Sequence, residues 1–224
     1  IEELIYNENR GKIALIEMDE RGNYSEPKTI LEKNYHLSYP FIIEEQGEFY
    51  MVPETSQNNT IELYKAVHFP DKWEFVSNIM EGVKAVDSTI IKHNNKYWLF
   101  CNVVENPGAS SWDELFIFMA DTLNSSEWIP HKDNPVVSDA SRARPAGRIF
   151  EFNGHLYRPS QDCSIRYGYG LNINKIITLS EDVYLEERVQ TIHPNWEKNI
   201  KATHTLSHAK NLTVVDAIYR RAFL

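Results

Sequence analysis

The sequence predicts an all-β fold of the β-propeller type, and three observations lead to this prediction. Four hairpin-like segments recur along the 224 residues. Four further pairs of strand-like segments lie between or beside them. No stretch shows a convincing helical pattern. Four strands per repeat of about 45–60 residues are typical of one propeller blade, which buries its faces only against neighbouring blades.

The recurring hairpins share apolar strand residues on both sides of a two-residue turn. They cover residues 42–52, 90–100, 149–159 and 206–216, with turns at Gln46-Gly47, Asn94-Asn95, Asn153-Gly154 and Lys210-Asn211. Asn and Gly tolerate the positive φ angles of a type I′ turn, so the Asn153-Gly154 turn is a strong hairpin signal. We interpret these hairpins as the inner strands of the blades.

The second set consists of two strands joined by a short polar link, and we interpret it as the outer strands. It covers 12–17 with 28–31, 61–66 with 73–76, 115–120 with 128–130, and 171–176 with 184–187. Only 180–187 could instead form a helical turn or two. The repeats alone leave two counts open. Either the last hairpin and the first outer strands complete one of four blades, or a hairpin before Ile1 makes the number five.

Composition narrows the classes of partner. A net charge of −9 argues against nucleic acid or an anionic membrane as the main partner, because both attract basic surfaces. No apolar run is long enough to span a membrane, and no signal peptide is recognisable. Two cysteines cannot build a disulfide framework or a Cys-rich zinc site. The 12% aromatic content suits a carbohydrate ligand, although aromatic residues also fill β-sheets.

Polar residues stand at the open ends of the inner strands. They are His36, Tyr39, Asp87, Arg144 and His204 at the first strands, and Glu54, Arg158, Gln161 and Asp162 at the second. Because inner strands surround one channel, we expect these side chains to converge at its mouth. Facing carboxyl groups suit glycosidic chemistry. Arginine suits a bidentate grip on a carboxylate or phosphate, so an anionic sugar is one hypothesis. Ion pairing, capping or packing is the structural alternative for each residue.

Several motifs, taken together, resemble a known family. HLSYPF, YMVPETS, AVDSTI, HKDNPVVSDASRARPAGRIF, LYRPSQD, RYGYG and THTLS are similar to a propeller module related to family 43-type glycoside hydrolases. The same module occurs at the N-terminus of glucosamine inositolphosphorylceramide transferases and in bacterial proteins joined to a formyltransferase-like domain. The resemblance covers about residues 2–220. It implies a five-bladed β-propeller whose first blade is incomplete here, with 1–224 as a single domain and a fragment of a longer protein.

The resemblance also implies roles for particular residues. Asp87 matches the aspartate that tunes the pKa of the acid in family 43-type hydrolases, and the base position falls before Ile1. The acid position falls on Arg144 or Pro145, neither of which donates a proton at neutral pH. We therefore expect Glu54, and next Asp162, to act as substitute carboxylates beside Asp87 if the protein is catalytic. The other candidates would bind substrate: Arg144, Arg158, Gln161, His36, Tyr39 and His204.

No cofactor is expected, and no residue is assigned as a metal ligand. The resemblance raises a calcium ion near His204 as the only candidate metal. It also implies a covalently linked transferase domain as a partner. Localisation is left open: cytoplasmic for a formyltransferase-linked bacterial protein, and otherwise secreted or lumenal.

Three functional hypotheses follow from the sequence. The leading one is a glycoside-hydrolase-like propeller that acts on or binds a glycan. The second is a non-catalytic glycan-recognition domain that serves a transferase. The third is a scaffold propeller that binds protein. Whether the chain is an enzyme is thus left open, and glycosidase chemistry is the form it would take.

Overall fold

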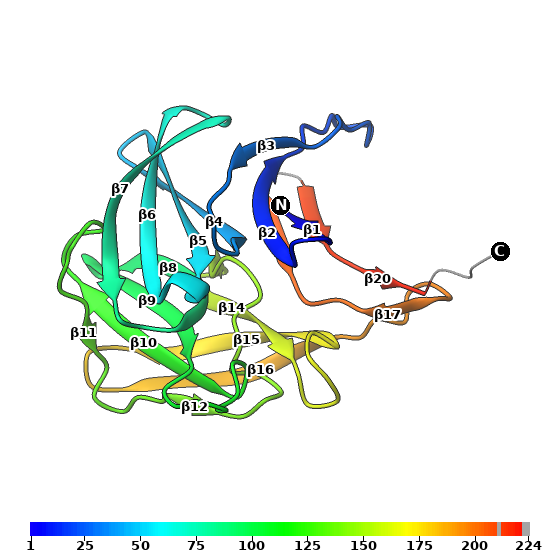
Figure 1. The fold of residues 1–224 in the computed structure, drawn as a ribbon. Coiled ribbons are helices and arrows are strands. Elements are labelled where there is room, and N and C mark those ends of the chain that lie inside the picture. The colour runs from blue at the N-terminus through cyan, green and yellow to red at the C-terminus, as the bar shows by residue number, and fades with distance from the viewer. Residues whose placement is uncertain (210–211, 221–224) are drawn as a thin grey trace. The chain divides into compact units, whose positions relative to one another are not determined.

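The computed structural model describes residues 1–209 and 212–220, which form antiparallel sheets and a single short 3-10 helix, η1 (Ser56–Asn58) (Figure 1). The contacts group into two compact units. Unit 1 comprises Ile1–Ser88 and Thr122–Trp128, and unit 2 comprises Thr89–Asp121 and Ile129–Leu224. The all-β prediction is confirmed.

Unit 1 contains one complete four-stranded sheet. Its order is β4-β5-β6-β7. The strands are β4 (Ser38–Glu45), β5 (Glu48–Thr55), β6 (Thr60–His68) and β7 (Lys72–Glu81). The predicted hairpin at 42–52 and the predicted pair at 61–66 and 73–76 therefore form one sheet. A separate sheet has the order β1-β2-β3. It consists of β1 (Glu2–Ile5), β2 (Arg10–Leu15) and β3 (Lys28–Leu31).

Two further sheets have the same strand order. One runs β8-β9-β10-β11, with β12 also paired to β10, and the other runs β13-β14-β15-β16. The first contains β8 (Ala85–His93), β9 (Lys96–Val103), β10 (Glu114–Ala120), β11 (Ile129–Pro130) and β12 (Val137–Ser138). The second contains β13 (Phe150–Phe152), β14 (His155–Asp162), β15 (Gly170–Leu179) and β16 (Tyr184–Ile192). The segment 180–187 therefore runs into a strand and does not form a helical turn.

Four short strands complete unit 2. They are β17 (Ile200–Ala202), β18 (Leu206–Ala209), β19 (Leu212–Val215) and β20 (Ile218–Tyr219). The pair β18-β19 is the predicted fourth hairpin, whereas the pair β17-β20 has no counterpart in the sequence prediction. In the described residues, β18-β19 and β1-β2-β3 are separate sheets, so the number of blades stays a prediction.

The hairpin turns have the backbone that the sequence predicts. The φ angles are 55° and 81° at Gln46-Gly47, 50° and 60° at Asn94-Asn95, and 49° and 72° at Asn153-Gly154. Two successive positive φ angles define the type I′ turn, whose twist matches that of the flanking strands. The fourth predicted turn, Lys210-Asn211, lies outside the described residues.

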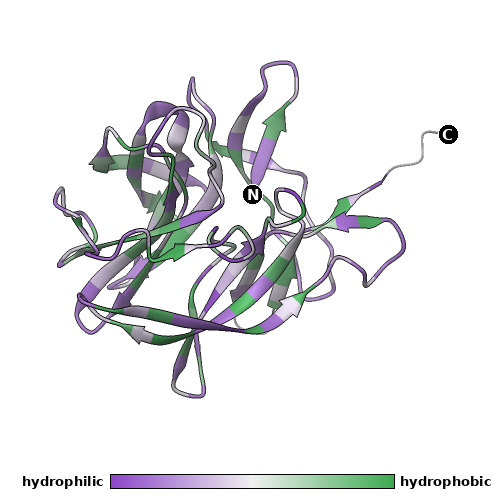
Figure 2. Cartoon of the chain, turned by 90° about the horizontal axis from the view of Figure 1, so that it is seen from below, coloured by the Kyte–Doolittle hydropathy of each residue, from purple (hydrophilic) through white to green (hydrophobic). Residues whose placement is uncertain are grey.

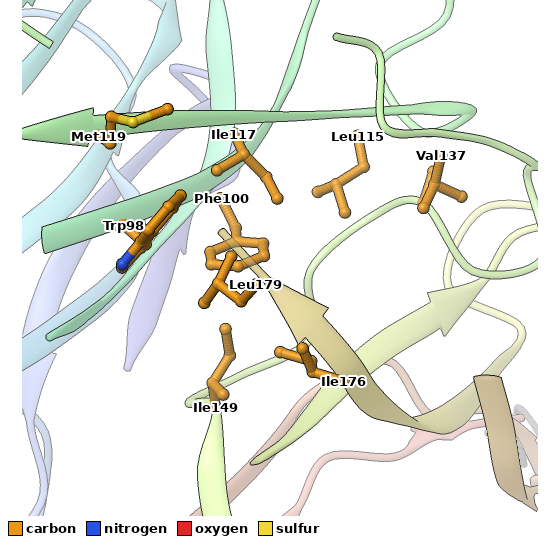
Figure 3. Packing of buried hydrophobic residues seen from close by; sticks show 10 residues of the cluster. Trp98, Phe100, Leu115, Ile117, Met119, Val137, Ile149, Ile176 and Leu179 are labelled. Atoms are coloured by element: carbon orange, nitrogen blue, oxygen red, sulfur yellow. The ribbon is translucent and has the colours of Figure 1, made fainter. Parts of the chain in front are cut away.

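Each unit has its own apolar core, and polar and apolar stretches are interleaved along the strands (Figure 2). In unit 1 the core cluster consists of Ile13, Leu37, Met51 and Tyr64. In unit 2 it joins the faces of two sheets, with Trp98, Phe100, Leu115, Ile117 and Met119 on one side and Ile176 and Leu179 on the other (Figure 3). Sheets that pack face to face in chain order are what stacked blades require.

Candidate functional site

Asp87 in unit 1 is a buried polar residue with an unusual backbone conformation. It lies near the start of β8, is only 3% exposed, and has a φ of 52°. A non-glycine residue in this left-handed region costs roughly 1–3 kcal/mol, and such residues persist only where the surrounding structure holds them. Strained backbone of this kind clusters at functional sites. Asp87 therefore keeps its place as the central candidate.

Glu54 lies directly beside Asp87. Its Oε2 accepts a hydrogen bond from the backbone N–H of Asp87 at 3.3 Å, and its Oε1 accepts one from the Ser56 hydroxyl at 2.8 Å. Glu54 stands opposite Ser38 in the β4–β5 ladder, at a register shift between Ser38 and Phe41. The Glu54 carboxylate thus contacts the backbone of Asp87, which places two of the three acidic residues that the sequence analysis singled out next to each other.

Tyr39 occupies that same irregular stretch of β4. Its φ is 40°, again in the left-handed region that a bulky side chain rarely adopts. Tyr39 and Asp87 stand at corresponding places, near the start of the first strand of their hairpins. Two hairpins thus have a non-glycine residue in the left-handed region near the start of their first strand.

His36 has a different environment. Its Nδ1 accepts a hydrogen bond from the Gly11 N–H at 2.9 Å, and its Nε2 lies 3.4 Å from a carboxylate oxygen of Glu2. A side chain at position 11 would have its Cβ 2.9 Å from the His36 ring and 2.4 Å from the Leu37 carbonyl oxygen. The imidazole is therefore wedged against β2, which is the environment of a packing histidine.

Arg144, in unit 2, precedes β13 and is 6% exposed. Its Nη1 donates to the Ser111 carbonyl oxygen at 3.0 Å and to the Ser111 hydroxyl at 3.1 Å. The guanidinium carbon lies 4.7 Å from the centre of the Tyr167 ring, a cation–π contact. The guanidinium thus joins the loop that contains Ser111 to the turn that contains Tyr167.

Tyr167 has two further ring neighbours. Trp112 lies 6.0 Å away between ring centroids, and His204 lies 5.7 Å away with its ring edge-on. The His204 Nδ1 forms an ion pair with Asp216, whose Oδ1 accepts the backbone N–H groups of His204 at 2.8 Å and Thr205 at 2.7 Å. Burial raises the pKa of Asp216, but the contacts with His204 lower it more, so the net pKa lies below its usual value. Asp216 fixes the position of the imidazole.

The remaining candidates contact the protein itself. Arg158 is 1% exposed and binds Glu186 with two hydrogen bonds of 2.7 and 2.8 Å. The Gln161 amide donates to the Pro145 carbonyl oxygen at 3.0 Å. Asp162 accepts the N–H and the hydroxyl of Ser164 at 3.0 and 2.6 Å, which closes a local turn. These contacts support strands and turns.

A calcium ion near His204 stays a prediction for the described residues. Among them, no group of three or more His, Cys, Asp or Glu side chains is placed to hold a metal ion, whereas calcium takes six to eight oxygen ligands. The carboxylate next to His204 is that of Asp216, which contacts the imidazole and accepts two backbone N–H groups. Separately, none of the helices within the described ranges has the length and apolar character that crossing a membrane requires.

Solved structures with a similar fold include two glycosidases. An exo-beta-1,3-galactanase from Phanerochaete chrysosporium matches with a TM-score of 0.58 and 12% identity, over 94% of this chain and 47% of that chain. A family 43 alpha-L-arabinofuranosidase from Clostridium thermocellum matches with a TM-score of 0.52 and 11% identity, over 81% of this chain and 67% of that chain. At such identities the likeness concerns the fold alone. It confirms a fold like that of family 43-type glycoside hydrolases.

The sequence places the chain more narrowly. Residues 7–216 match the family described as "Glucosamine inositolphosphorylceramide transferase 1, N-terminal", and the chain belongs to this family. The transferase of that name from Arabidopsis thaliana is 36% identical over 183 residues, which are 80% of this chain and 24% of the relative. The one from Oryza sativa subsp. japonica is 36% identical over 158 residues, which are 70% of this chain and 21% of the relative. The chain thus spans about a quarter of the length of these relatives.

Three residues of the unit 2 cluster were missed by sequence reasoning. Tyr167 stands within the RYGYG motif, which the sequence analysis used only for the family resemblance. Asp216 stands at the end of the fourth predicted hairpin, and His204 stands just before its start. Only the expectation that the two ends of a hairpin lie close together could have placed Asp216 next to His204. Trp112 lies in an irregular loop with no periodic pattern, so nothing in the sequence distinguishes it from other exposed tryptophans.

Proposed function

We propose that this chain is a non-catalytic glycan-recognition module, a propeller of five blades in the complete protein, that serves a transferase domain. The observation that carries the proposal is the environment of Arg144. The resemblance places the acid of family 43-type hydrolases on Arg144 or Pro145, and Arg144 has a buried guanidinium bound to Ser111 and Tyr167. A guanidinium holds its proton throughout the physiological pH range and cannot protonate a leaving group.

Glycan binding is supported by the polar ends of the hairpins. The Asp87 and Glu54 carboxylates are acceptors suited to sugar hydroxyl groups, and hydrogen bonds from the Asp87 N–H and the Ser56 hydroxyl hold the Glu54 carboxylate in place. Preorganised acceptors lose little conformational entropy when a ligand binds. The family of the chain supports the link to a transferase, because the relatives carry this module within a protein about four times as long.

The environments of the arginines alter the expected ligand. The anionic-sugar hypothesis rested on Arg144 and Arg158, and both guanidinium groups are buried and bound by protein groups. With a net charge of −9, the chain would also repel an anion at long range. We therefore propose that recognition relies on hydroxyl groups and ring faces and does not require a charge on the sugar.

The test is a glycan array of pentose, hexose, hexosamine and uronic acid oligosaccharides, probed with the full chain and followed by calorimetry on the glycans that bind. The informative variant is Asp87→Asn, because asparagine tolerates a left-handed backbone and keeps the size of the side chain. We expect about a tenfold or greater loss of affinity, which corresponds to about 1.4 kcal/mol, with an unchanged melting temperature. Asp121→Asn, at a side chain that is 85% exposed, is the matched control.

Two outcomes would overturn the proposal. If no glycan on the array binds, the hypothesis of a scaffold propeller that binds protein remains. Release of sugar that depends on the carboxylates would restore the hydrolase hypothesis, which the proximity of Glu54 to Asp87 favours. Reducing-sugar release from the bound glycans, compared between the unaltered chain and Glu54→Gln, decides between recognition and hydrolysis. We expect no release from either protein.

A further inference from the structure

Tyr167 is the centre of an aromatic cluster in unit 2 that the proposed function does not yet use. Despite contacts with Arg144, Trp112 and His204, it is 45% exposed, and Trp112 is 37% exposed. Large aromatic side chains usually bury most of their area, so two adjacent exposed rings require an explanation. Their rings are tilted by 50° to each other, so they offer two neighbouring apolar surfaces.

Arg144 connects the two aromatic residues of the cluster. Arg144 binds Ser111, the neighbour of Trp112, and at the same time lies over the Tyr167 ring. The backbone N–H of Trp112 donates a hydrogen bond to the Ser110 hydroxyl at 3.1 Å, which stabilises the same loop. One buried cation therefore sets the relative position of the two aromatic residues.

The other side of Tyr167 is fixed by His204. Gly168 has a φ of 63°, and a side chain there would place its Cβ 2.9 Å from the His204 Cβ. Glycine at this position allows the imidazole to approach the Tyr167 turn, and Asp216 holds the imidazole through its ion pair. The exposed rings are thus preorganised, which reduces the entropy that a ligand must overcome.

We propose that Trp112 and Tyr167 form a stacking platform for the apolar face of a sugar ring, and that Arg144 is a positioning residue that holds the platform together. The ligand class is a pyranose or furanose ring, charged or neutral, because the platform itself offers ring surface and no exposed cation. This inference rests on the proposed function and assigns it a ligand contact within unit 2.

The test uses the glycan array described above and calorimetry with the full chain. Trp112→Ala and Tyr167→Ala should each weaken binding about ten- to hundredfold, the loss expected when the burial of one aromatic side chain is removed. Tyr167→Phe, which keeps the ring, should bind like the unaltered chain. The matched control is Trp196→Ala, because Trp196 is also an exposed tryptophan of unit 2, at 47%, and lies outside the cluster.

Arg144→Lys separates a positioning role from charge recognition. Lysine keeps the charge but lacks the planar group that bridges Ser111 and stacks on Tyr167. We expect equal loss of affinity for neutral and uronic acid glycans. Selective loss of the uronic acid glycans would mean that Arg144 binds an anion and would overturn its positioning role. Trp112→Phe should keep binding but remove the ligand-induced change in tryptophan emission.

The failures of the two proposals are distinguishable. Absence of glycan binding by the unaltered chain overturns both. Binding that is weakened by Asp87→Asn but unchanged by Trp112→Ala and Tyr167→Ala overturns the platform and leaves the recognition function intact. Melting temperatures of all variants, measured alongside, show whether a loss of binding reflects unfolding.

Discussion

The two units each bury a carboxylate, and they stabilise it in different ways. In unit 1, Glu62 on β6 is 2% exposed. The groups described as donating hydrogen bonds to its carboxylate are all neutral. These donors are Tyr35 at 2.8 Å, Thr60 at 2.9 Å, Asn58 at 3.0 Å, and Tyr64. In unit 2, Glu186 on β16 binds the buried Arg158 with two hydrogen bonds and accepts the Tyr184 hydroxyl at 2.6 Å.

The difference shows two ways to offset the cost of burying a charge. Burial raises the pKa of Glu62, but the hydrogen bonds from Tyr64, Tyr35, Thr60 and Asn58 outweigh it, and the net pKa lies below the usual value. Neutral donors stabilise the carboxylate without bringing a second charge into the interior. The ion pair in unit 2 desolvates two charges, so its stability depends on keeping both partners. Removing one of the four donors to Glu62 should therefore lower the free energy of unfolding only in part. Removing one partner of the ion pair should lower it much more, because the other charge stays buried and unpaired.

The largest expected effect is therefore that of Arg158→Met. The change leaves Glu186 buried without its cation and also removes the hydrogen bond of 2.7 Å to the Arg142 carbonyl oxygen. We expect a loss of about 3–5 kcal/mol in the free energy of unfolding, measured by urea denaturation. The double variant Arg158→Met/Glu186→Leu should recover part of this loss, because no uncompensated charge is left. A single variant as stable as the unaltered chain would contradict the interpretation.

Tyr64→Phe should have a smaller effect. It removes one donor from Glu62 and leaves Tyr35, Thr60 and Asn58 in place. A hydrogen bond to a charged group contributes about 1.5–3 kcal/mol, and the remaining donors should keep the loss within that range. The control is Tyr50→Phe, at a half-buried tyrosine of β5 that is not among the described donors to Glu62. If both variants lose the same free energy of unfolding, the hydrogen bond from Tyr64 to Glu62 contributes no measurable stability.

The smallest effect concerns pH. Because the pKa of Glu62 is lower in the folded protein, its stabilisation is present above the usual value of 4.5 and is lost as pH falls through the folded value. Burial and the hydrogen bond to Glu62 raise the pKa of Tyr35 from 10.0 to about 12, so its contribution is fully present below pH 10 and is lost as pH rises towards the folded pKa of about 12. Stability should therefore form a plateau between these limits in melting experiments. Glu62→Gln should flatten the acid side and also weaken the alkaline dependence, because the Glu62 carboxylate contributes to the raised pKa of Tyr35.

The hairpins and their turns could be predicted because their signals are local. Asn94-Asn95 and Asn153-Gly154 adopt positive φ angles wherever the strands on both sides can pair, and the alternation of apolar residues sets which face is buried. The proximity of Glu54 to Asp87 followed from the same argument, because both stand at the ends of inner strands. The fourth turn is outside the described residues, and the blade count needs the complete ring.

The roles of the arginines could not be predicted in this way. Arg144 and Arg158 stand in similar Arg-Pro pairs, yet one joins an exposed aromatic cluster and the other a buried ion pair. Nothing in the neighbouring residues distinguishes them. Their partners lie 33 and 28 residues away, at Ser111 and Glu186, and only the packing of the sheets brings these residues together.

The sequence by itself determined the strands, the tight turns and the placing of polar residues at the hairpin ends, because these depend on backbone preferences and on a side-chain period of two. The tertiary structure alone decided which charges are buried, which aromatic rings stay exposed, and which residues hold them. Burial and long-range hydrogen bonds arise only when sheets pack against one another. For that reason Tyr167 and Trp112 emerge as a candidate subsite from the structure, whereas Asp87 was already a candidate from the sequence.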